Sequence, residues 1–292
     1  MRPFRYTGDR DNQTMNSTPL DARSLHLRSL VVRGLVGGNR GHVGASMSLI
    51  EILRVLYDDV LDYRANEPDW ADRDRFILSK GHGCLALYAI LADKGYFDAS
   101  LLDQFCHVEG KLGGHPERGK APGIEASTGA LGHGLSIGVG MALAARAQKR
   151  KSRVFVAMGD GEINEGSVWE AALSAGKHKL SNLCAIVDYN KIQSAGFTRD
   201  IQNLEPLLDK WQSFGFAAVD VDGHNVGALQ QVLRGLPVDG EKPTAIICHT
   251  VKGKGIPFAE NDPKWHHHAK FTPDQLADLY AAVGNPHEGA TQ

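Results

Sequence analysis

Two apolar segments that each run directly into small and polar residues constrain the fold of this chain most strongly. Val154–Met158 leads into the sequence Gly-Asp-Gly at 159–161, and Leu183–Val187 leads into Asp-Tyr-Asn at 188–190. Short apolar runs of this kind are typical of buried strands. In parallel α/β sheets, ligands lie just beyond the carboxyl ends of such strands. The two segments therefore predict neighbouring strands that end at one ligand-binding edge of a sheet.

The rest of the chain alternates helical and strand patterns without an internal repeat or a low-complexity linker. This alternation predicts an α/β fold, a doubly wound parallel sheet of about five strands with helices on both faces. The predicted strands are Arg75–Leu78, Val154–Met158, Leu183–Val187, Ala217–Val221 and Thr244–Cys248. The predicted helices are Leu25–Val36, Ser48–Val60, Leu131–Ala147, Ser167–Lys177 and Val226–Leu236, with another beginning near Pro273.

Composition favours an ordinary globular protein. The chain has 292 residues, of which 42% are hydrophobic and 23% charged, and its formal net charge is -2. This balance gives no electrostatic reason to expect a nucleic acid or a membrane as a partner. Residues 1–20 are polar and are expected to form a mobile arm, with Met15 as an alternative start; residues 21–292 are expected to form a single domain. The first residues resemble neither a signal peptide nor a membrane anchor.

The four cysteines predict a reducing environment. Cys84, Cys106, Cys184 and Cys248 are isolated from one another, and no Cys-x-x-Cys pair suggests a zinc or redox site. Reduced, buried thiols are the expected state, which indicates a cytoplasmic protein.

The residues after the two strands suit a magnesium diphosphate. Magnesium takes one or two carboxylates together with phosphate oxygens and waters, and Asp160 and the side-chain oxygen of Asn190 fit that shell. The flanking glycines allow backbone amides to approach a phosphate closely.

A long stretch rich in glycine, residues 110–134, separates two helical regions. Loops of this length in compact domains are usually functional or disordered. His115, Thr128 and His133 lie among glycines that permit a close approach of the backbone to a ligand. We expect this loop to order around a diphosphate and a substrate; a loose surface excursion is the alternative.

Several of the thirteen histidines fall in turns flanked by glycine, where imidazoles can exchange protons near neutral pH. His42, His82, His115 and His266 are the functional candidates. The triplet 266–268 also admits a metal-binding interpretation, but consecutive side chains point in different directions and no second cluster has the spacing of zinc ligands.

Gly-Asp-Gly followed by Asn190 resembles the thiamine diphosphate motif. Four further segments belong to the same pattern: Gly41–Gly44, Ser79–Gly83, Gly113–Glu117 and Ser127–Gly134. Together with Lys252–Gly255 and Trp265-His266, they make residues 24–270 resemble the first half of a transketolase. Two positions depart from the family pattern: His267 replaces a common glycine, and His133 stands where glutamine is frequent.

The resemblance implies thiamine diphosphate and Mg²⁺, with Ca²⁺ or Mn²⁺ as substitutes, and ketol transfer from a ketose to an aldose with the cofactor as electron sink. The implied metal ligands are Asp160, Asn190 and the carbonyl of Ile192. The implied cofactor contacts are His82, Gly129, Leu131, Gly159, Asp160, Gly161, Glu162, Asn190 and His266. The implied catalytic residues are His42, His115, His266 and Glu165. Glu165 would join a carboxylate network across a dimer, although a solvent-facing charge in the first turn of a helix is the alternative.

The resemblance also implies a partner. The glutamate that activates the aminopyrimidine belongs to a pyrimidine-binding domain, and no second set of strands remains before Gln292 to build one. We therefore expect a split transketolase, inactive alone, whose separate C-terminal subunit completes an α2β2 assembly acting on sugar phosphates. Pentose phosphates, branched sugar phosphates and sulfonated sugars all stay open as substrates.

Three rival interpretations remain at this point. The first is the alpha subunit of a 2-oxo acid dehydrogenase or decarboxylase, against which Gly-His-Pro-Glu and Lys-Gly-Lys-Gly argue. The second is a 1-deoxyxylulose-5-phosphate synthase, whose pyrimidine domain normally lies on the same chain. The third is a module that binds the cofactor without catalysis.

Overall fold

The computed structural model describes residues 18–284 and has a five-stranded parallel sheet at its centre, in the order β1-β2-β3-β7-β6. A small antiparallel pair, β4 with β5, lies outside this sheet. The doubly wound fold and all five predicted strands are confirmed. Residues 1–17 of the predicted arm lie outside the described residues. The strands are β1 (Arg75–Leu78), β2 (Val154–Gly159), β3 (Leu183–Tyr189), β4 (Ile192–Gln193), β5 (Gly196–Phe197), β6 (Ala217–Asp222) and β7 (Thr244–His249).

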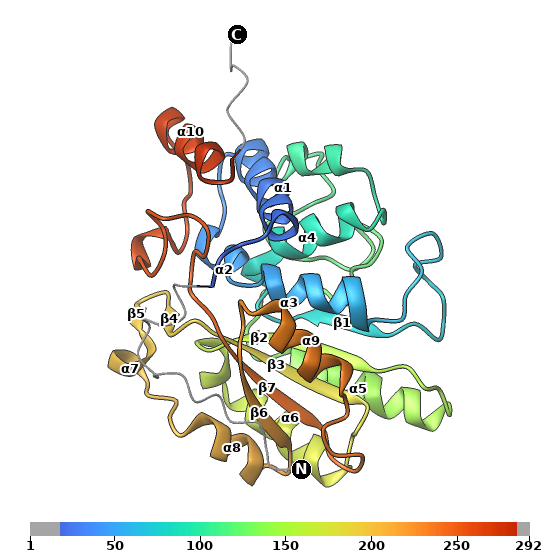
Figure 1. The fold of residues 1–292 in the computed structure, drawn as a ribbon. Coiled ribbons are helices and arrows are strands. Elements are labelled where there is room, and N and C mark those ends of the chain that lie inside the picture. The colour runs from blue at the N-terminus through green and yellow to red at the C-terminus, as the bar shows by residue number, and fades with distance from the viewer. Residues whose placement is uncertain (1–17, 285–292) are drawn as a thin grey trace.

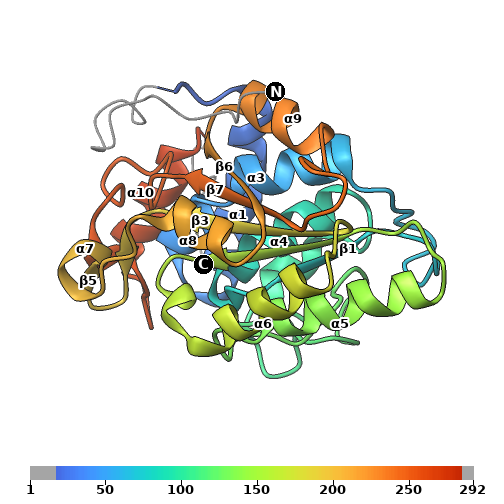
Figure 2. The ribbon, with the colours of Figure 1, turned by 90° about the horizontal axis from the view of Figure 1, so that it is seen from below.

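Helices cover both faces of the sheet (Figures 1 and 2). Helices α1, α3, α4 and α9 pack on one face, and α5, α6 and α8 pack on the other. None of the helices within residues 18–284 is long and apolar enough to cross a bilayer. The α-helices are α1 (Ala22–Gly38), α2 (Val43–Met47), α3 (Ile50–Val55), α4 (Cys84–Asp93), α5 (Gly134–Ala147), α6 (Gly166–Lys177), α7 (Thr198–Ile201), α8 (Leu207–Ser213), α9 (Val226–Arg234) and α10 (Pro273–Ala282). A π-helix, η2 (Leu56–Val60), continues α3, and the 3-10 helices are η3 (Gly81–Gly83), η4 (Ala99–Gln104), η5 (Glu162–Asn164) and η6 (Pro263–Trp265).

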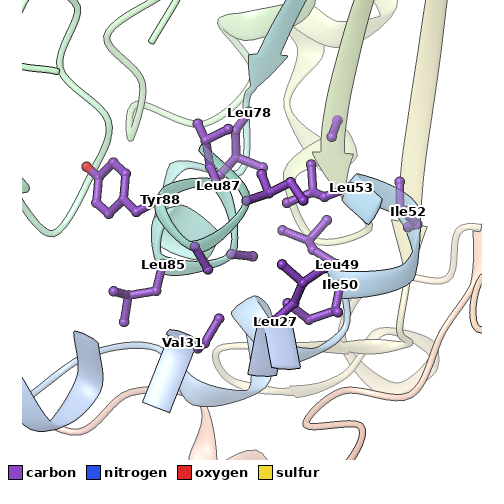
Figure 3. Close-up of a cluster of buried hydrophobic side chains, with 14 of the residues drawn as sticks. Leu27, Val31, Leu49, Ile50, Ile52, Leu53, Leu78, Leu85, Leu87 and Tyr88 are labelled. Atoms are coloured by element: carbon purple, nitrogen blue, oxygen red, sulfur yellow. The ribbon is translucent and has the colours of Figure 1, made fainter. Parts of the chain in front are cut away.

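The central strands are buried on both sides, which explains their unbroken apolar sequences. Along β2, Phe155 faces the core under α1, α3 and α4, whereas Val154 and Val156 face the core under α5 and α6. Figure 3 shows Leu85 and Leu87 of α4 in the first of these cores. Because both faces of these central strands are dry, their polar residues are confined to their ends.

Several helix boundaries differ from the prediction. The helix predicted from Leu131 begins at Gly134, because Gly132 has φ +80°, which a right-handed helix does not accommodate. The helix predicted over Val226–Leu236 ends at Arg234. Helices α4 and α8 were not predicted. Helix α4 is apolar on nearly all sides and so lacks a 3.6-residue pattern, and α8 is too short to display one.

Candidate active site

Four adjacent strands deliver the candidate residues to one edge of the sheet. β1 is followed by Ser79–Gly83, β2 by Asp160 and Gly161, β3 by Asn190, and β7 by Thr250–Lys254. Since these strands are parallel neighbours, their carboxyl ends meet at the same edge, as the sequence predicted.

Asp160 and Asn190 are buried at this edge. The Asp160 carboxylate accepts hydrogen bonds from the amides of Gly161, at 2.8 Å, and of Lys191. Oδ1 of Asn190 accepts from the amide of Ile192 at 3.1 Å. Burial, and then the charge of Asp188, raises the pKa of Asp160. A carboxylate so placed is stabilised by a cation, and a carboxylate, an amide oxygen and a carbonyl are the hard oxygen donors that Mg²⁺ prefers.

These donors therefore fit a magnesium ion. Within the described residues, no group of three or more His, Cys, Asp or Glu side chains could hold a metal ion. The triplet 266–268 is therefore not such a group. The carbonyl of Ile192, the third expected ligand, accepts a hydrogen bond from Nζ of Lys252 at 2.7 Å. A carbonyl oxygen has a second lone pair, so this contact leaves room for a metal bond.

Gln193 offers a donor for a diphosphate beside this donor set, and Gly161 lies against it. A Cβ on Gly161 would lie 2.8 Å from Cβ of Gln193, so only glycine brings the two segments this close. Nε2 of Gln193 is buried and has no hydrogen-bond partner. An unpartnered buried donor is costly, and a phosphate oxygen would satisfy it. The residues present thus fit an anionic group at this edge. Gln193 was not predicted as a site residue, because a single glutamine after a strand gives no signal.

A buried ion pair under the site was also missed. Nζ of Lys80 contacts Oδ2 of Asp188, and both side chains are almost fully buried. Ser48 donates to the same oxygen at 2.6 Å, and Thr250 donates to Oδ1. Burial alone would raise the pKa of Asp188, but the charge and hydrogen bond of Lys80, together with the hydroxyls of Ser48 and Thr250, lower it, so the carboxylate stays charged. Both residues belong to segments that the sequence marks as functional, but their pairing depends on the sheet register, which the sequence does not reveal.

Four histidines surround His42. Ring centroids of His82, His115, His266 and His267 lie 5.3, 6.4, 5.5 and 4.4 Å from that of His42. Burial, followed by the neighbouring imidazoles, lowers the pKa of His42 to about 3. The cluster brings together the four predicted histidines and adds His267.

His82 and His266 are held neutral as well. Burial, and then Lys80, lowers the pKa of His82, while burial, and then Lys252, lowers that of His266 to about 4. Nζ of Lys252 lies 2.8 Å from Nδ1 of His266. Because an ammonium only donates, Nδ1 is the acceptor and Nε2 of His266 carries the proton. A neutral His266 therefore presents an N–H to whatever lies beside it.

The long glycine-rich loop is anchored, not loose. The Tyr88 hydroxyl lies 3.0 Å from the carbonyls of both Gly113 and His115, and Oγ1 of Thr128 donates to the carbonyl of Leu78 at 2.7 Å. The His115 ring packs on Gly129, where a Cβ would lie 2.9 Å from the ring. Gly129 also has φ +132°, so both the close contact and the backbone conformation favour glycine there.

The Glu162 carboxylate accepts hydrogen bonds from three separate segments of the chain. Its Oε1 accepts from the Gly132 amide at 3.0 Å and from the Ser79 hydroxyl, and its Oε2 accepts from the Gly159 amide at 3.1 Å. Burial raises the pKa of Glu162, and these hydrogen bonds partly offset the rise. In this structure Glu162 therefore positions the loops that carry the predicted cofactor contacts.

Leu131 and Glu165 lie at the rim of the site. Leu131 is 36% exposed, and Glu165 is exposed at the start of α6. Glu165 packs against Gly132, where a Cβ would lie 2.6 Å from that of Glu165. His133 is exposed, with Nδ1 2.9 Å from the carbonyl of Leu131.

A parallel sheet with oxygen donors and neutral histidines at one edge defines an α/β domain with a candidate cofactor site at that edge. The family described as "Transketolase, thiamine diphosphate binding domain" matches residues 22–289. The chain belongs to the transketolase thiamine diphosphate-binding domain family, whose enzymes are transferases.

Two relatives are 44% identical to this chain. One is an apulose-4-phosphate transketolase subunit from Actinobacillus succinogenes, matched over 240 residues, 82% of this chain and 87% of the relative. The other is the 6-deoxy-6-sulfo-D-fructose transketolase subunit SqwG of a Clostridium species, matched over 220 residues, 75% of this chain and 80% of the relative. These relatives favour the transketolase interpretation over the 2-oxo acid alternative.

The fold matches solved transketolases. The transketolase from Leishmania mexicana superimposes with a TM-score of 0.84 at 30% identity, over 94% of this chain and 42% of that chain. The transketolase from Campylobacter jejuni gives the same TM-score at 29% identity, over 96% of this chain and 44% of that chain. This chain thus spans less than half the length of these solved enzymes.

Proposed function

We propose that this chain is the thiamine diphosphate-binding subunit of a split transketolase, which transfers a two-carbon ketol unit from a ketose to an aldose. One observation carries the proposal: the oxygen donors Asp160 and Asn190 and the neutral histidine cluster share one sheet edge in a chain whose relatives are transketolase subunits. In this role, residues 21–292 form the diphosphate-binding domain.

Asp160, Asn190 and the carbonyl of Ile192 hold Mg²⁺, for which Ca²⁺ or Mn²⁺ can substitute. Thiamine diphosphate supplies the electron sink that the reaction needs. Gly161 and His82 contact the diphosphate, and Glu162 keeps the surrounding loops in place. Gly129, Leu131 and Gly159 complete the cofactor contacts on the same edge.

The histidines orient the sugar and move protons on its oxygens. His42 and His115 face the hydroxyls and the reacting carbonyl, and their neutral neighbours can donate or accept hydrogen bonds. His266 presents its Nε2 proton because Lys252 occupies Nδ1. Removal of water by the assembled site strengthens these contacts.

A separate C-terminal subunit supplies the pyrimidine-binding domain in an α2β2 complex. The word "subunit" in the names of two relatives supports a second chain. Exposed Glu165 at the rim is available for the carboxylate network that joins two sites. The substrates are sugars with a phosphate or related group, as in the names of the relatives. Four free cysteines support a cytoplasmic location.

The test is ketol transfer with magnesium and thiamine diphosphate, measured for this chain alone and with the product of a neighbouring gene, over a panel of ketose donors. We expect turnover only in the mixture. Full turnover by the pure chain contradicts the split arrangement, and decarboxylation of a 2-oxo acid without ketol transfer contradicts the reaction.

A further inference from the structure

The segment of residues 251–254 carries Lys252, whose ammonium lies between two groups of the candidate site. Nζ of Lys252 donates to the carbonyl of Ile192 at 2.7 Å and lies 2.8 Å from Nδ1 of His266. The aliphatic stem of Lys252 packs on Gly44, where a Cβ would lie 2.7 Å from Cγ of the lysine. A shift of this segment would therefore move the contacts of both a proposed metal ligand and a proposed cofactor ligand.

Two buried side chains hold the segment on either side of Lys252. Nε2 of His224 accepts a hydrogen bond from the amide of Val251 at 2.8 Å. Nε of Arg28 donates to the carbonyl of Lys254, also at 2.8 Å. His224 follows β6 and Arg28 lies on α1, so the two anchors come from distant parts of the chain. Because they bind the backbone before and after Lys252, they fix the position from which its side chain extends.

The carboxylate of Glu51, on α3, joins these two anchors. Arg28 donates to its two oxygens at 2.6 and 3.0 Å, and Nδ1 of His224 lies 2.8 Å from Oε2. Since Nε2 of His224 accepts from an amide, Nδ1 carries the proton and donates to Glu51. Burial alone would raise the pKa of Glu51, but the charge of Arg28 and the hydrogen bonds of both partners lower it, so this carboxylate is charged. The three side chains, each at most 1% exposed, are called the Glu51 network below.

The same network reaches the other side of Lys252. Arg28 also donates to the carbonyl of Met47 at 3.3 Å, at the end of α2, the helix that contains Gly44. The amide of Gly253 donates to the carbonyl of Gly44 at 3.1 Å, so α2 and the lysine segment are joined directly as well. The backbone on both sides of Lys252 is therefore held by contacts that lead back to one buried carboxylate.

We propose that the Glu51 network positions Lys252 and, through it, keeps His266 as the tautomer with its proton on Nε2. The consequence rests on the proposed function, in which this N–H donates to the anionic cofactor, whereas the other tautomer would turn an acceptor toward it. Buried ion pairs add little net stability, because the cost of removing both charges from water offsets their attraction. Positioning of Lys252 gives these buried charges a role that stability alone does not.

Two substitutions separate the two contacts of His224. In His224→Asn the amide nitrogen can replace Nδ1 and still donate to Glu51, but no side-chain acceptor remains for the amide of Val251. In His224→Gln the amide oxygen can replace Nε2 and still accept from Val251, but the donor to Glu51 is lost. A third variant, Glu51→Gln, removes the charge that joins the anchors.

The matched control is Glu125→Gln. Glu125 likewise accepts from one arginine through both oxygens, at 2.9 and 3.0 Å from Arg73, and its other side-chain partner among the described residues is Arg75. The change therefore breaks a comparable carboxylate–arginine contact that does not involve the lysine segment. It should lower the midpoint of urea unfolding without changing the tautomer of His266.

The tautomer is measured by ¹⁵N NMR of the histidine rings in the full-length chain, with the resonances of His266 assigned through His266→Gln. Near neutral pH this imidazole is uncharged, so its two nitrogen resonances report which nitrogen carries the proton. In the complex of both subunits, the magnesium-dependent affinity for thiamine diphosphate is measured by titration calorimetry.

Wild type should show the Nε2–H tautomer alone, and His224→Asn and Glu51→Gln should show both tautomers. The same two variants should lose about tenfold in cofactor affinity, as the loss of one charge-assisted hydrogen bond predicts. His224→Gln should stay within about threefold of wild type, because the contact with the lysine segment is kept. Glu125→Gln should stay within about twofold.

The Nε2–H tautomer alone in folded His224→Asn and Glu51→Gln overturns the proposal, and so does an equal effect of the two substitutions of His224. A changed tautomer in Glu125→Gln overturns it as well, because the effect would then follow from general destabilisation. If Glu51→Gln does not fold, the two variants of His224 still decide, since each removes one hydrogen bond of the same side chain. Absence of ketol transfer by the wild-type complex overturns the proposed function and leaves the tautomer result standing, so the two fail separately.

Discussion

Loss of the buried charge of Lys80 is the perturbation whose effect can be worked out most directly. The Lys80 side chain is 1% exposed and that of Asp188 is fully buried. Lys80→Met preserves most of the aliphatic chain but leaves the Asp188 carboxylate with only the hydroxyls of Ser48 and Thr250 as side-chain donors. Removing one partner of a buried pair costs about 3–5 kcal/mol, a large part of the roughly 5–15 kcal/mol that stabilises a typical domain.

The assay is urea unfolding of the purified chain, followed by circular dichroism. Lys179→Met is the matched control, because its ion pair with Glu241 has side chains 68% and 77% exposed and should contribute less than about 1 kcal/mol. A double variant, Lys80→Met with Asp188→Asn, removes the isolated charge and should recover much of the loss. A Lys80→Met cost no larger than that of Lys179→Met would refute the assignment of a buried, charge-compensating pair.

Three further predictions concern the site. His115→Ala should preserve cofactor affinity and lower kcat by about 10²–10⁴ in the assembled complex, as loss of a proton-transfer group does; loss of the cofactor by a folded variant would instead assign His115 to the diphosphate. Gly129→Ala should lower the midpoint of urea unfolding and displace the His115 ring, because the Cβ would lie 2.9 Å from it at φ +132°; an unchanged midpoint contradicts this. His42 has a folded pKa of about 3 against about 6.5 unfolded, so the unfolded chain binds protons first and about 2 kcal/mol of stability is lost between pH 7.5 and 5. His42→Gln should lose correspondingly less over that range, and equal acid sensitivity of both proteins would count against a buried neutral His42.

The sheet, and the edge at which the candidate site residues meet, were predictable because strands that are buried on both faces are apolar along their length. Val154–Met158 and Leu183–Val187 are apolar at every position, so their polar successors, Asp160 and Asn190, had to lie at strand ends. Helix α4 escaped prediction for the same physical reason, since a helix buried on nearly all sides has no polar stripe.

Contacts between distant segments could not be predicted in the same way. The Lys80–Asp188 pair depends on the register of β1, β2 and β3, and no local pattern encodes that register. The helix that begins at Gly134 instead of Leu131 depends on Glu162, which holds the Gly132 amide. The cavity beside the histidine cluster likewise joins segments that lie far apart in the sequence, Arg40–His42 and the loop containing Phe105–Lys120.

Binding of thiamine diphosphate as a function of magnesium concentration tests the central claim most directly. Titration calorimetry of the assembled complex, wild type against Asp160→Ala, measures it without relying on turnover. The account predicts magnesium-dependent binding by wild type and a loss of affinity of at least about a hundredfold in the variant, because Asp160 is the only carboxylate among the proposed metal ligands. Equal affinity of the two proteins, both shown to be folded, would contradict the assignment of this sheet edge as the metal and diphosphate site.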